Sequence, residues 1–350
     1  MRYPKELPNG GCIGFPAPSF GCAIEPYYSA FQNSLKKWES LGYKTKPGFN
    51  AYASEGVGIS NTPQKCAEEF VQMYLEQDTD VLISCGGGEL MCEILDYVDF
   101  DALKGTAPKW FAGYSDNTNL TYLLATICDV ASIYGPCAAA YGMEPWHPAI
   151  RDAYDLLIGE KHVLYGYDLW EKESLKDEEH PLLPYNVTEP RILKIYDGST
   201  FFDNAKECGK TIELQGRLLG GCMDCLVNIL GTKYDKTTEY ADRYAEDGIL
   251  WFLEACDLNN FSIRRAIWQM EHADWFKHVK GFLIGRPGNG EAIMGLNAYE
   301  AVLPLLEKYH VPVIFDVDIG HVAPMMPLVV GSVARVVVLG NAIEIAMEYR

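Results

Sequence analysis

Short apolar runs alternate with helix-like stretches through the first 130 residues of the chain. The apolar runs have the length of buried strands and lie at 12–16, 81–85 and 110–112; the helix-like stretches lie at 27–41, 63–76, 89–98 and 119–127. Parallel strands need a crossover connection, which a helix usually supplies. This alternation therefore predicts a parallel sheet with helices on both of its faces.

The alternation returns in the last third of the chain, after a stretch of different character. Apolar runs typical of strands lie at 248–253, 279–284, 311–317 and 334–339. Residues 168–210 instead carry the charged run 171–179 and three prolines, without sustained periodicity, which indicates a linker or a long surface loop. We expect an α/β protein with an N-terminal parallel-sheet domain over 1–167, a linker or loop over 168–212, and a mixed, β-rich α/β domain over 213–350.

Composition excludes several classes of partner. A formal net charge of −19 and 48% hydrophobic residues predict a folded acidic protein, whereas binding to nucleic acid or to an anionic membrane needs a basic surface. No run approaches the roughly 20 apolar residues of a membrane span. We therefore expect a cytoplasmic protein with no nucleic-acid or membrane partner.

The cysteines predict buried thiols rather than a disulfide framework. Their number, eleven, is odd, and most of them lie inside apolar segments. One Cys-x-x-Cys motif, Cys222 to Cys225, has half the ligands of a zinc site or the pattern of a redox pair. No second such pair exists, so we favour packing at the start of a helix and expect no metal and no other cofactor.

One serine lies where a strand is expected to turn sharply into a helix. The segment Gly113-Tyr114-Ser115-Asp116-Asn117 follows the apolar run 110–112, and the helix-like stretch 119–127 begins just after it. Such a turn is the nucleophile elbow of many hydrolases, which exposes the serine hydroxyl and aims the next backbone N–H groups at the attacked carbonyl. The usual second glycine is replaced by Asn117. Ser115 is a candidate nucleophile, and capping of the helix is the alternative interpretation.

Two further strand ends carry the other groups that a serine nucleophile needs. Glu254 ends the apolar run 249–253, and His321 follows Gly320 after the run 311–317. A histidine takes the hydroxyl proton and a carboxylate orients the ring, so Ser115, His321 and Glu254 form a complete set. Asp257 is a rival for the orienting role.

A glycine run offers the remaining component of acyl-transfer chemistry. Gly86-Gly87-Gly88 follows the apolar run 81–85, and its spacing matches neither a dinucleotide-binding nor a P-loop motif. Backbone N–H groups of Gly87 or Gly88, together with that of Asp116, are candidates for binding the oxyanion.

The chain resembles the family of serine peptidases that includes LD-carboxypeptidase A and the microcin C immunity carboxypeptidase MccF. The matching motifs span nearly the whole chain in order. They are Gly87-Gly88, Glu93-Ile94-Leu95, Asp99-Phe100, Gly113 to Thr118, Tyr134-Gly135-Pro136, Arg217 to Cys222, Gly231-Thr232, Leu253-Glu254, Gly285-Arg286-Pro287 and Gly320-His321. The length and the segment 285–287 are more similar to the MccF branch than to the shorter cell-wall enzymes.

The resemblance implies a place for the site and a reaction. The serine lies in the N-terminal domain and the glutamate and histidine in the C-terminal domain, so the active site is expected in the interdomain cleft, in a homodimeric enzyme. The implied reaction is acyl-enzyme hydrolysis by a serine carboxypeptidase. Its substrate is either a peptidyl- or aminoacyl-nucleotide, which we favour, or the L,D bond to the terminal D-Ala of a muropeptide tetrapeptide.

Several residues are weaker candidates for binding substrate. Arg217 and Arg286 have guanidinium groups that suit a carboxylate or phosphate, Trp170 has a ring that suits a nucleotide base, and Asp257 lies near Glu254 in sequence. The alternatives are interdomain salt bridges for the arginines and core packing for Trp170. Two alternatives belong to other functional classes. The chain could be a protein that only sequesters its ligand, or a redox protein that uses Cys222 and Cys225.

Overall fold

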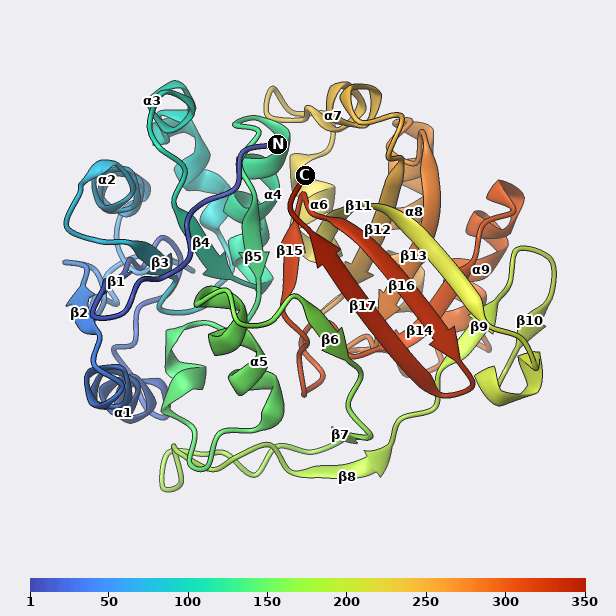
Figure 1. Ribbon diagram of the computed structural model, residues 1–350, viewed down its shortest axis with the longest axis horizontal. Coiled ribbons are helices and arrows are strands. Elements are labelled where there is room, and N and C mark those ends of the chain that lie inside the picture. Colours follow the sequence, from blue (N-terminus) through green and yellow to red (C-terminus); the bar gives the residue numbers. More distant parts are fainter. The chain divides into compact units, whose positions relative to one another are not determined.

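The computed structural model describes residues 1–350, which divide into two compact units (Figure 1). Unit 1 comprises 1–161 and 173–186, and unit 2 comprises 162–172 and 187–350. The chain therefore leaves unit 1 for a short segment, returns to it, and then completes unit 2.

Unit 1 is built on a parallel sheet with the strand order β5-β4-β3-β1-β2. Its strands are β1 (Cys12–Phe15), β2 (Lys44–Pro47), β3 (Val81–Ile83), β4 (Trp110–Gly113) and β5 (Ser132–Tyr134). Its helices are α1 (Tyr27–Ser40), α2 (Pro63–Leu75), α3 (Phe100–Gly105), α4 (Thr118–Thr126) and α5 (Pro148–Leu157), with 3₁₀-helices η1 (Met91–Tyr97), η2 (Ser115–Asn117) and η3 (Ala138–Gly142). The predicted parallel sheet is confirmed.

The strand order brings the functional loops of unit 1 to one edge. The chain passes from β1 outward to β2, then returns to the other side of β1 to form β3 and β4. Loops at the carboxyl ends of parallel strands on either side of such a reversal collect ligand-binding groups in α/β folds. The loops after β3 and β4 carry the glycine run and Ser115, respectively.

Unit 2 is built on a nine-stranded mixed sheet with the order β10-β9-β14-β13-β12-β11-β16-β17-β6, of which β11 to β14 run parallel. The strands of this sheet are β6 (Val163–Tyr165), β9 (Lys194–Tyr196), β10 (Phe201–Phe202), β11 (Ile212–Cys222), β12 (Ile249–Glu254), β13 (Val279–Gly285), β14 (Val313–Val317), β16 (Val333–Leu339) and β17 (Ala342–Glu348). The unit also contains the strands β7 (Leu169–Glu171), β8 (Val187–Pro190) and β15 (Leu328–Val330). Its helices are α6 (Met223–Ile229), α7 (Thr237–Arg243), α8 (Asn260–His272) and α9 (Ala298–Leu306), with 3₁₀-helices η4 (Ala205–Cys208) and η5 (Glu307–Tyr309). The predicted β-rich α/β character is confirmed.

The centre of unit 2 is closely packed around β12, the strand that ends in Glu254. All six residues of β12 are buried, and the ring of Trp251 on this strand stacks on that of Trp275 at 5.9 Å between centroids. Close-packed aromatic side chains resist displacement, so the strand that ends in Glu254 has a fixed position within the unit.

The stretch 168–212 differs from the linker or loop that we expected. β7 and β8 pair with each other, and β9 pairs with β14 and β10 in the large sheet. These strands are two to four residues long, too short to show a periodicity, and β9 pairs with a strand more than 100 residues away in sequence. The expectation of a helix at 89–98 also needs correction, because η1 is a 3₁₀-helix.

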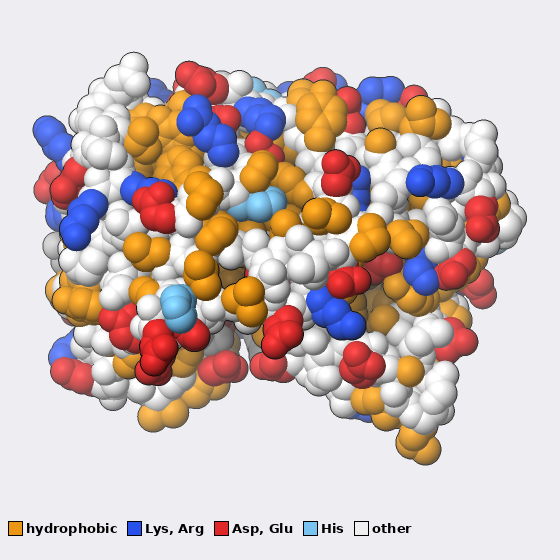
Figure 2. All heavy atoms as spheres, turned by 90° about the horizontal axis from the view of Figure 1, so that it is seen from below, with side chains coloured by type: hydrophobic (Ala, Val, Ile, Leu, Met, Phe, Trp, Pro, Cys, Tyr) orange, Lys and Arg blue, Asp and Glu red, His pale blue; other side chains and the backbone are white.

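The surface seen in Figure 2 carries charges of both signs. Basic side chains are scattered among acidic and hydrophobic ones on this face and do not form one continuous patch. No helix has the combination of length and apolar character that crossing a membrane requires.

Candidate active site

Ser115 has the strained backbone of a nucleophile elbow. It follows β4 after a single intervening residue, begins η2, and has a φ of 62°, in the left-handed region that side chains other than glycine rarely adopt. Strain of this kind costs about 1–3 kcal/mol and persists where the surrounding structure holds it in place. The sequence predicted the sharp turn, and the structure adds that the serine itself carries the strain.

Gly87 is the member of the glycine run that lies beside Ser115. A Cβ built on Gly87 would be 3.1 Å from Cβ and 3.2 Å from Oγ of Ser115, so a larger residue here would press on the serine side chain. A Cβ on Gly88 would instead collide with the hydroxyl of Ser19. Of these two glycines, Gly87 is thus the one whose added Cβ would face Ser115.

Asp116 fastens the elbow to neighbouring loops through its side chain. Its buried carboxylate accepts hydrogen bonds from the hydroxyl of Ser19 (2.6 Å), the backbone N–H of Met91 (2.9 Å) and the amide of Asn119 (3.0 Å). Burial raises the pKa of Asp116 to about 6, although these hydrogen bonds favour the ionised form. Sequence reasoning assigned only a backbone role to Asp116 and missed this anchoring role.

Asn117 accounts for the departure from the usual elbow motif. Its side-chain amide donates to the carbonyl oxygens of Gly86 (2.8 Å) and Tyr114 (3.0 Å), which ties the glycine run to the serine loop. A Cβ on Gly113 would be 2.8 Å from Cγ of Asn117. The asparagine therefore replaces the second glycine without loss of the turn, because Gly113 leaves room for it.

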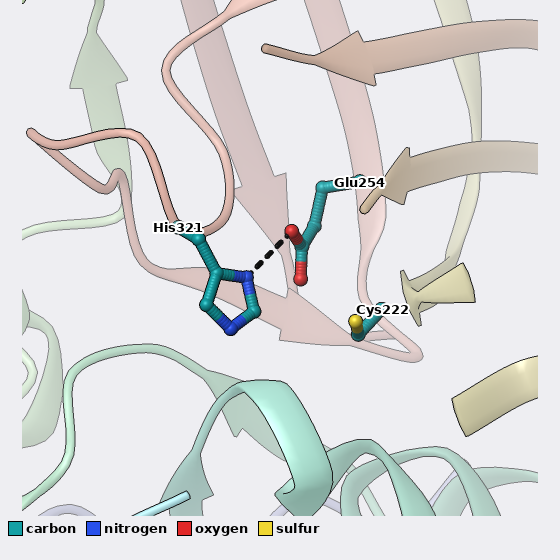
Figure 3. A group of neighbouring side chains, drawn as sticks. All are labelled: Cys222, Glu254 and His321. Carbon is teal, nitrogen blue, oxygen red and sulfur yellow. Dashed lines mark hydrogen bonds and ion pairs between the residues drawn. The ribbon is translucent and has the colours of Figure 1, made fainter. Parts of the chain in front are cut away.

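Glu254 and His321 form a hydrogen-bonded pair in unit 2. Nδ1 of His321 lies 2.8 Å from Oε2 of Glu254 (Figure 3). Glu254, the last residue of β12, is fully buried, and the His321 side chain is 17% exposed. A buried carboxylate held against one ring nitrogen fixes the imidazole so that Nε2 is the nitrogen for proton transfer.

The charge of Glu254 controls the protonation of His321. Burial of the ring opposes its protonated form, but the neighbouring Glu254 carboxylate and the hydrogen bonds that the ring makes with Cys256 and Glu254 raise the pKa of His321 above its usual value. A raised pKa stabilises the imidazolium, the species that a general base becomes when it takes a proton. It also means that the neutral ring, the form that can accept a proton, is fully present only at pH values above the usual histidine range.

Replacing Glu254 with glutamine is expected to move the pH profile. Loss of the carboxylate charge lowers the pKa of His321, so the acidic limb of kcat/KM should move down by about 1–3 pH units while kcat itself falls. The measurement is kcat/KM against pH. Asp257→Asn is the matched control, because Asp257 is exposed and the carboxylate that pairs with His321 is that of Glu254, so an equal shift in that variant would contradict the assignment.

Gly320 makes the pair possible. Its φ is 95°, and a Cβ at this position would collide with the carboxylate of Glu254. Glycine is therefore required both for the backbone conformation and for the space.

Replacing Gly320 with alanine is expected to lower kcat/KM by about 10-fold or more. The added Cβ would displace the Glu254 carboxylate, and a rise of about 1.4 kcal/mol in the activation free energy already corresponds to a tenfold loss. Gly340→Ala is the matched control: it has φ 56°, but its added Cβ would meet only a side-chain atom at 3.6 Å. Steady-state kinetics and thermal unfolding of both variants separate a backbone penalty from damage to the site. Equal losses of activity in the two variants would contradict this account.

The Cys-x-x-Cys motif encloses a residue that sequence reasoning missed. The carboxylate of Asp224 accepts the backbone N–H groups of Cys256 (3.0 Å), Asp257 (3.0 Å) and Leu258 (3.1 Å), which fixes the loop that follows Glu254. This anchoring leaves the side chain of Asp257 exposed, and it is Glu254 that pairs with His321. A carboxylate in the first turn of α6 was the only signal in the sequence.

The two candidate arginines have different surroundings. Arg217 is buried, donates to Asp247 (3.1 Å from Nε) and lies over the ring of Tyr244 at 4.0 Å, which are the contacts of a structural residue. Arg286 donates from Nη2 to Asp318 (2.7 Å), lies 5.4 Å from the ring centroid of Trp170, and has a buried Nη1 without a hydrogen-bond partner. Trp170 and Arg286, predicted separately, are therefore neighbours in unit 2.

Comparison with known proteins identifies both halves of the chain. Residues 13–135 match the LD-carboxypeptidase N-terminal domain, and residues 215–336 match the LD-carboxypeptidase C-terminal domain. The microcin C7 self-immunity protein MccF of Escherichia coli is 25% identical over 83% of this chain and 80% of its own length. The Bacillus subtilis protein named probable murein peptide carboxypeptidase is 23% identical over 95% of this chain and 90% of its own.

A solved structure shows the same fold. The structure of MccF in complex with aspartyl sulfamoyl adenosine is 21% identical, has a TM-score of 0.78, and covers 99% of this chain and 98% of that chain. The resemblance that the motifs indicated is thus confirmed by matches to both domains in the expected order. The chain belongs to the LD-carboxypeptidase family.

Proposed function

We propose that this protein is a serine carboxypeptidase in which Ser115 is the nucleophile, His321 the general base and Glu254 the residue that orients the base. The observation that carries the proposal is the strained Ser115 at the end of β4, with Gly87 beside its hydroxyl. The hydrogen bond between His321 and Glu254 supports it from unit 2. The proposal includes the assembly of these groups into one site in the active enzyme.

The mechanism follows from the chemistry of each group. Oγ of Ser115 attacks the scissile carbonyl carbon while Nε2 of His321 takes the hydroxyl proton, and the carboxylate of Glu254 stabilises the resulting imidazolium. The backbone N–H groups of Gly87 and Asp116 bind the oxyanion; each such donor is typically worth about 2.7–4 kcal/mol. His321 then protonates the leaving amine, and water, activated by the same ring, hydrolyses the acyl-enzyme.

For the substrate we propose an acidic aminoacyl or peptidyl group joined to a nucleotide by an amide-type bond. MccF, which shares the fold, has been solved with aspartyl sulfamoyl adenosine. In this chain, Arg286 has the unpaired Nη1 that an anionic group would engage, and the neighbouring Trp170 has a half-buried ring suited to a base.

Kinetics on two substrates are expected to separate the substrate classes. An aspartyl sulfamoyl adenosine should be hydrolysed with a much higher kcat/KM than an L,D-muropeptide tetrapeptide. Trp170→Ala should weaken hydrolysis of the former selectively, by about 10-fold for each 1.4 kcal/mol of lost stacking. Trp268→Ala is the matched control, because that tryptophan is 53% exposed and lies on α8. Mass-spectrometric turnover provides the measurement.

Release of D-Ala from muropeptides in wall recycling is the second candidate function. The similarity to the Bacillus subtilis protein favours it. Turnover of the muropeptide alone would establish this function in place of the first. Tight binding of either compound with no turnover by the purified protein would instead indicate a sequestering protein.

A further inference from the structure

Cys222 lies against the His321–Glu254 pair. It ends β11, the strand next to β12, and is the register partner of Glu254. One ligand atom from each of Cys222, Glu254 and His321 lies within 4.8 Å of the other two (Figure 3). Cys222 is 1% exposed and Glu254 is fully buried, whereas His321 retains access to solvent. Three groups of different chemistry thus converge, and one of them is partly exposed.

A thiolate, a carboxylate and an imidazole form a ligand set suited to zinc. Zn²⁺ binds sulfur at about 2.3 Å and nitrogen or carboxylate oxygen at about 2.0–2.2 Å, so ligand atoms in a tetrahedral site lie about 3.5 Å apart. Adjustment of the three side chains by about 1 Å brings the observed cluster to that size. Cysteine also favours soft or borderline cations over Mg²⁺ and Ca²⁺.

We propose that Cys222, Glu254 and His321 form a site for a thiophilic divalent cation such as Zn²⁺, and that the bound ion inhibits the enzyme. The inhibition rests on the proposed function, whereas the binding site does not. Three protein ligands would hold the ion, and water would complete a tetrahedral set.

The proton balance of binding explains the inhibition. The Cys222 thiol releases its proton to solvent as the bond from sulfur to the ion forms, and His321 must be neutral to offer a nitrogen lone pair. Glu254 directs a carboxylate oxygen to the ion and no longer holds the ring for proton transfer. The base and its orienting carboxylate are therefore both engaged by the ion.

The sequence gives no sign of this site because its ligands come from three distant segments. Cys222 and Cys225 have the spacing of half a zinc site, but the cluster contains only Cys222 of that pair. Its other two ligands lie 32 and 99 residues further along the chain. Parallel pairing of β11 with β12 and the turn at Gly320 bring them together.

The experiment measures metal binding separately from hydrolysis. Full-length protein is treated with EDTA, freed of the chelator, and titrated with Zn²⁺ by calorimetry and with Co²⁺ by absorbance, where a cysteine ligand produces a thiolate-to-metal charge-transfer band. Hydrolysis is followed with and without Zn²⁺, and then after renewed addition of EDTA. We expect one tight site per chain, a Co²⁺–thiolate band, and inhibition that EDTA reverses.

Variants locate the site. Cys222→Ser and His321→Ala should each weaken Zn²⁺ binding at least 10-fold, and Cys222→Ser should abolish the Co²⁺–thiolate band. Cys208→Ser is the matched thiol control, because Cys208 is half-buried on η4, and it should bind as the unaltered protein does. Thermal unfolding of each variant checks its fold, and the two separate ligand substitutions keep the test valid if one variant misfolds.

Each contrary result has a definite meaning. A band that survives in Cys222→Ser, or one that is lost in Cys225→Ser but unchanged in His321→Ala, would overturn the site. Zn²⁺ binding at the cluster without inhibition would overturn the inhibitory role. Ser115→Ala should bind Zn²⁺ normally while failing to hydrolyse substrate, so failure of the proposed catalytic function would leave the metal-binding result intact.

Discussion

Ser115→Ala is expected to lower the rate of hydrolysis by a factor of about 10³ or more while leaving a folded protein that binds substrate. The nucleophile is lost, but the oxyanion donors and the rest of the site remain, and loss of a catalytic serine in comparable enzymes costs even more. Single-turnover assays and ligand binding provide the measurements. Ser132→Ala is the matched control, because Ser132 is a buried serine of unit 1 that donates only to the carbonyl of Thr121 (2.7 Å).

The backbone strain at Ser115 allows a second test at this position, which measures stability rather than activity. Ser115→Gly should be at least as stable as Ser115→Ala, because glycine adopts a φ of 62° without the steric cost that alanine pays. Both variants should be inactive. An active Ser115→Ala enzyme, freed of contaminating peptidase, would end the serine mechanism.

His321→Ala and Glu254→Gln are expected to be severely impaired, and adding Ser115→Ala to either should cause little further loss. Residues that act as one unit are strongly non-additive, because removal of any member disables the others. The measurement is kcat/KM for the single and double variants. Losses that multiply across the series would show that Ser115 acts independently of the His321–Glu254 pair.

His162→Ala is the matched control for this series. His162 also belongs to unit 2, but its ring packs against Tyr349 at 4.8 Å and does not contact Glu254. Its replacement should leave the rate unchanged within a few-fold, and its combination with Ser115→Ala should behave as two independent changes. Thermal unfolding of every variant separates lost activity from lost structure.

The prediction of the fold succeeded where the signal is local. Buried strands such as 81–83 and 110–113 are short apolar runs bounded by turns, and the helices between them have enough turns to show a periodicity. It failed for the stretch 168–212, where β9 and β10 are two or three residues long. Such strands are stabilised by pairing with β14 or with each other, and that pairing leaves no local pattern.

The sequence by itself determined the chain's family, because the family's motifs occur in order along the chain. It also determined the strand ends that Ser115, Glu254 and His321 follow or occupy, because a turn after an apolar strand is encoded by residues next to one another. The tertiary structure decided which groups meet. It paired His321 with Glu254 rather than Asp257, placed Gly87 beside Ser115, and engaged Arg217 in structural contacts. These outcomes depend on the register of neighbouring strands and on the space left by glycines such as Gly320, which bring together atoms far apart in the chain.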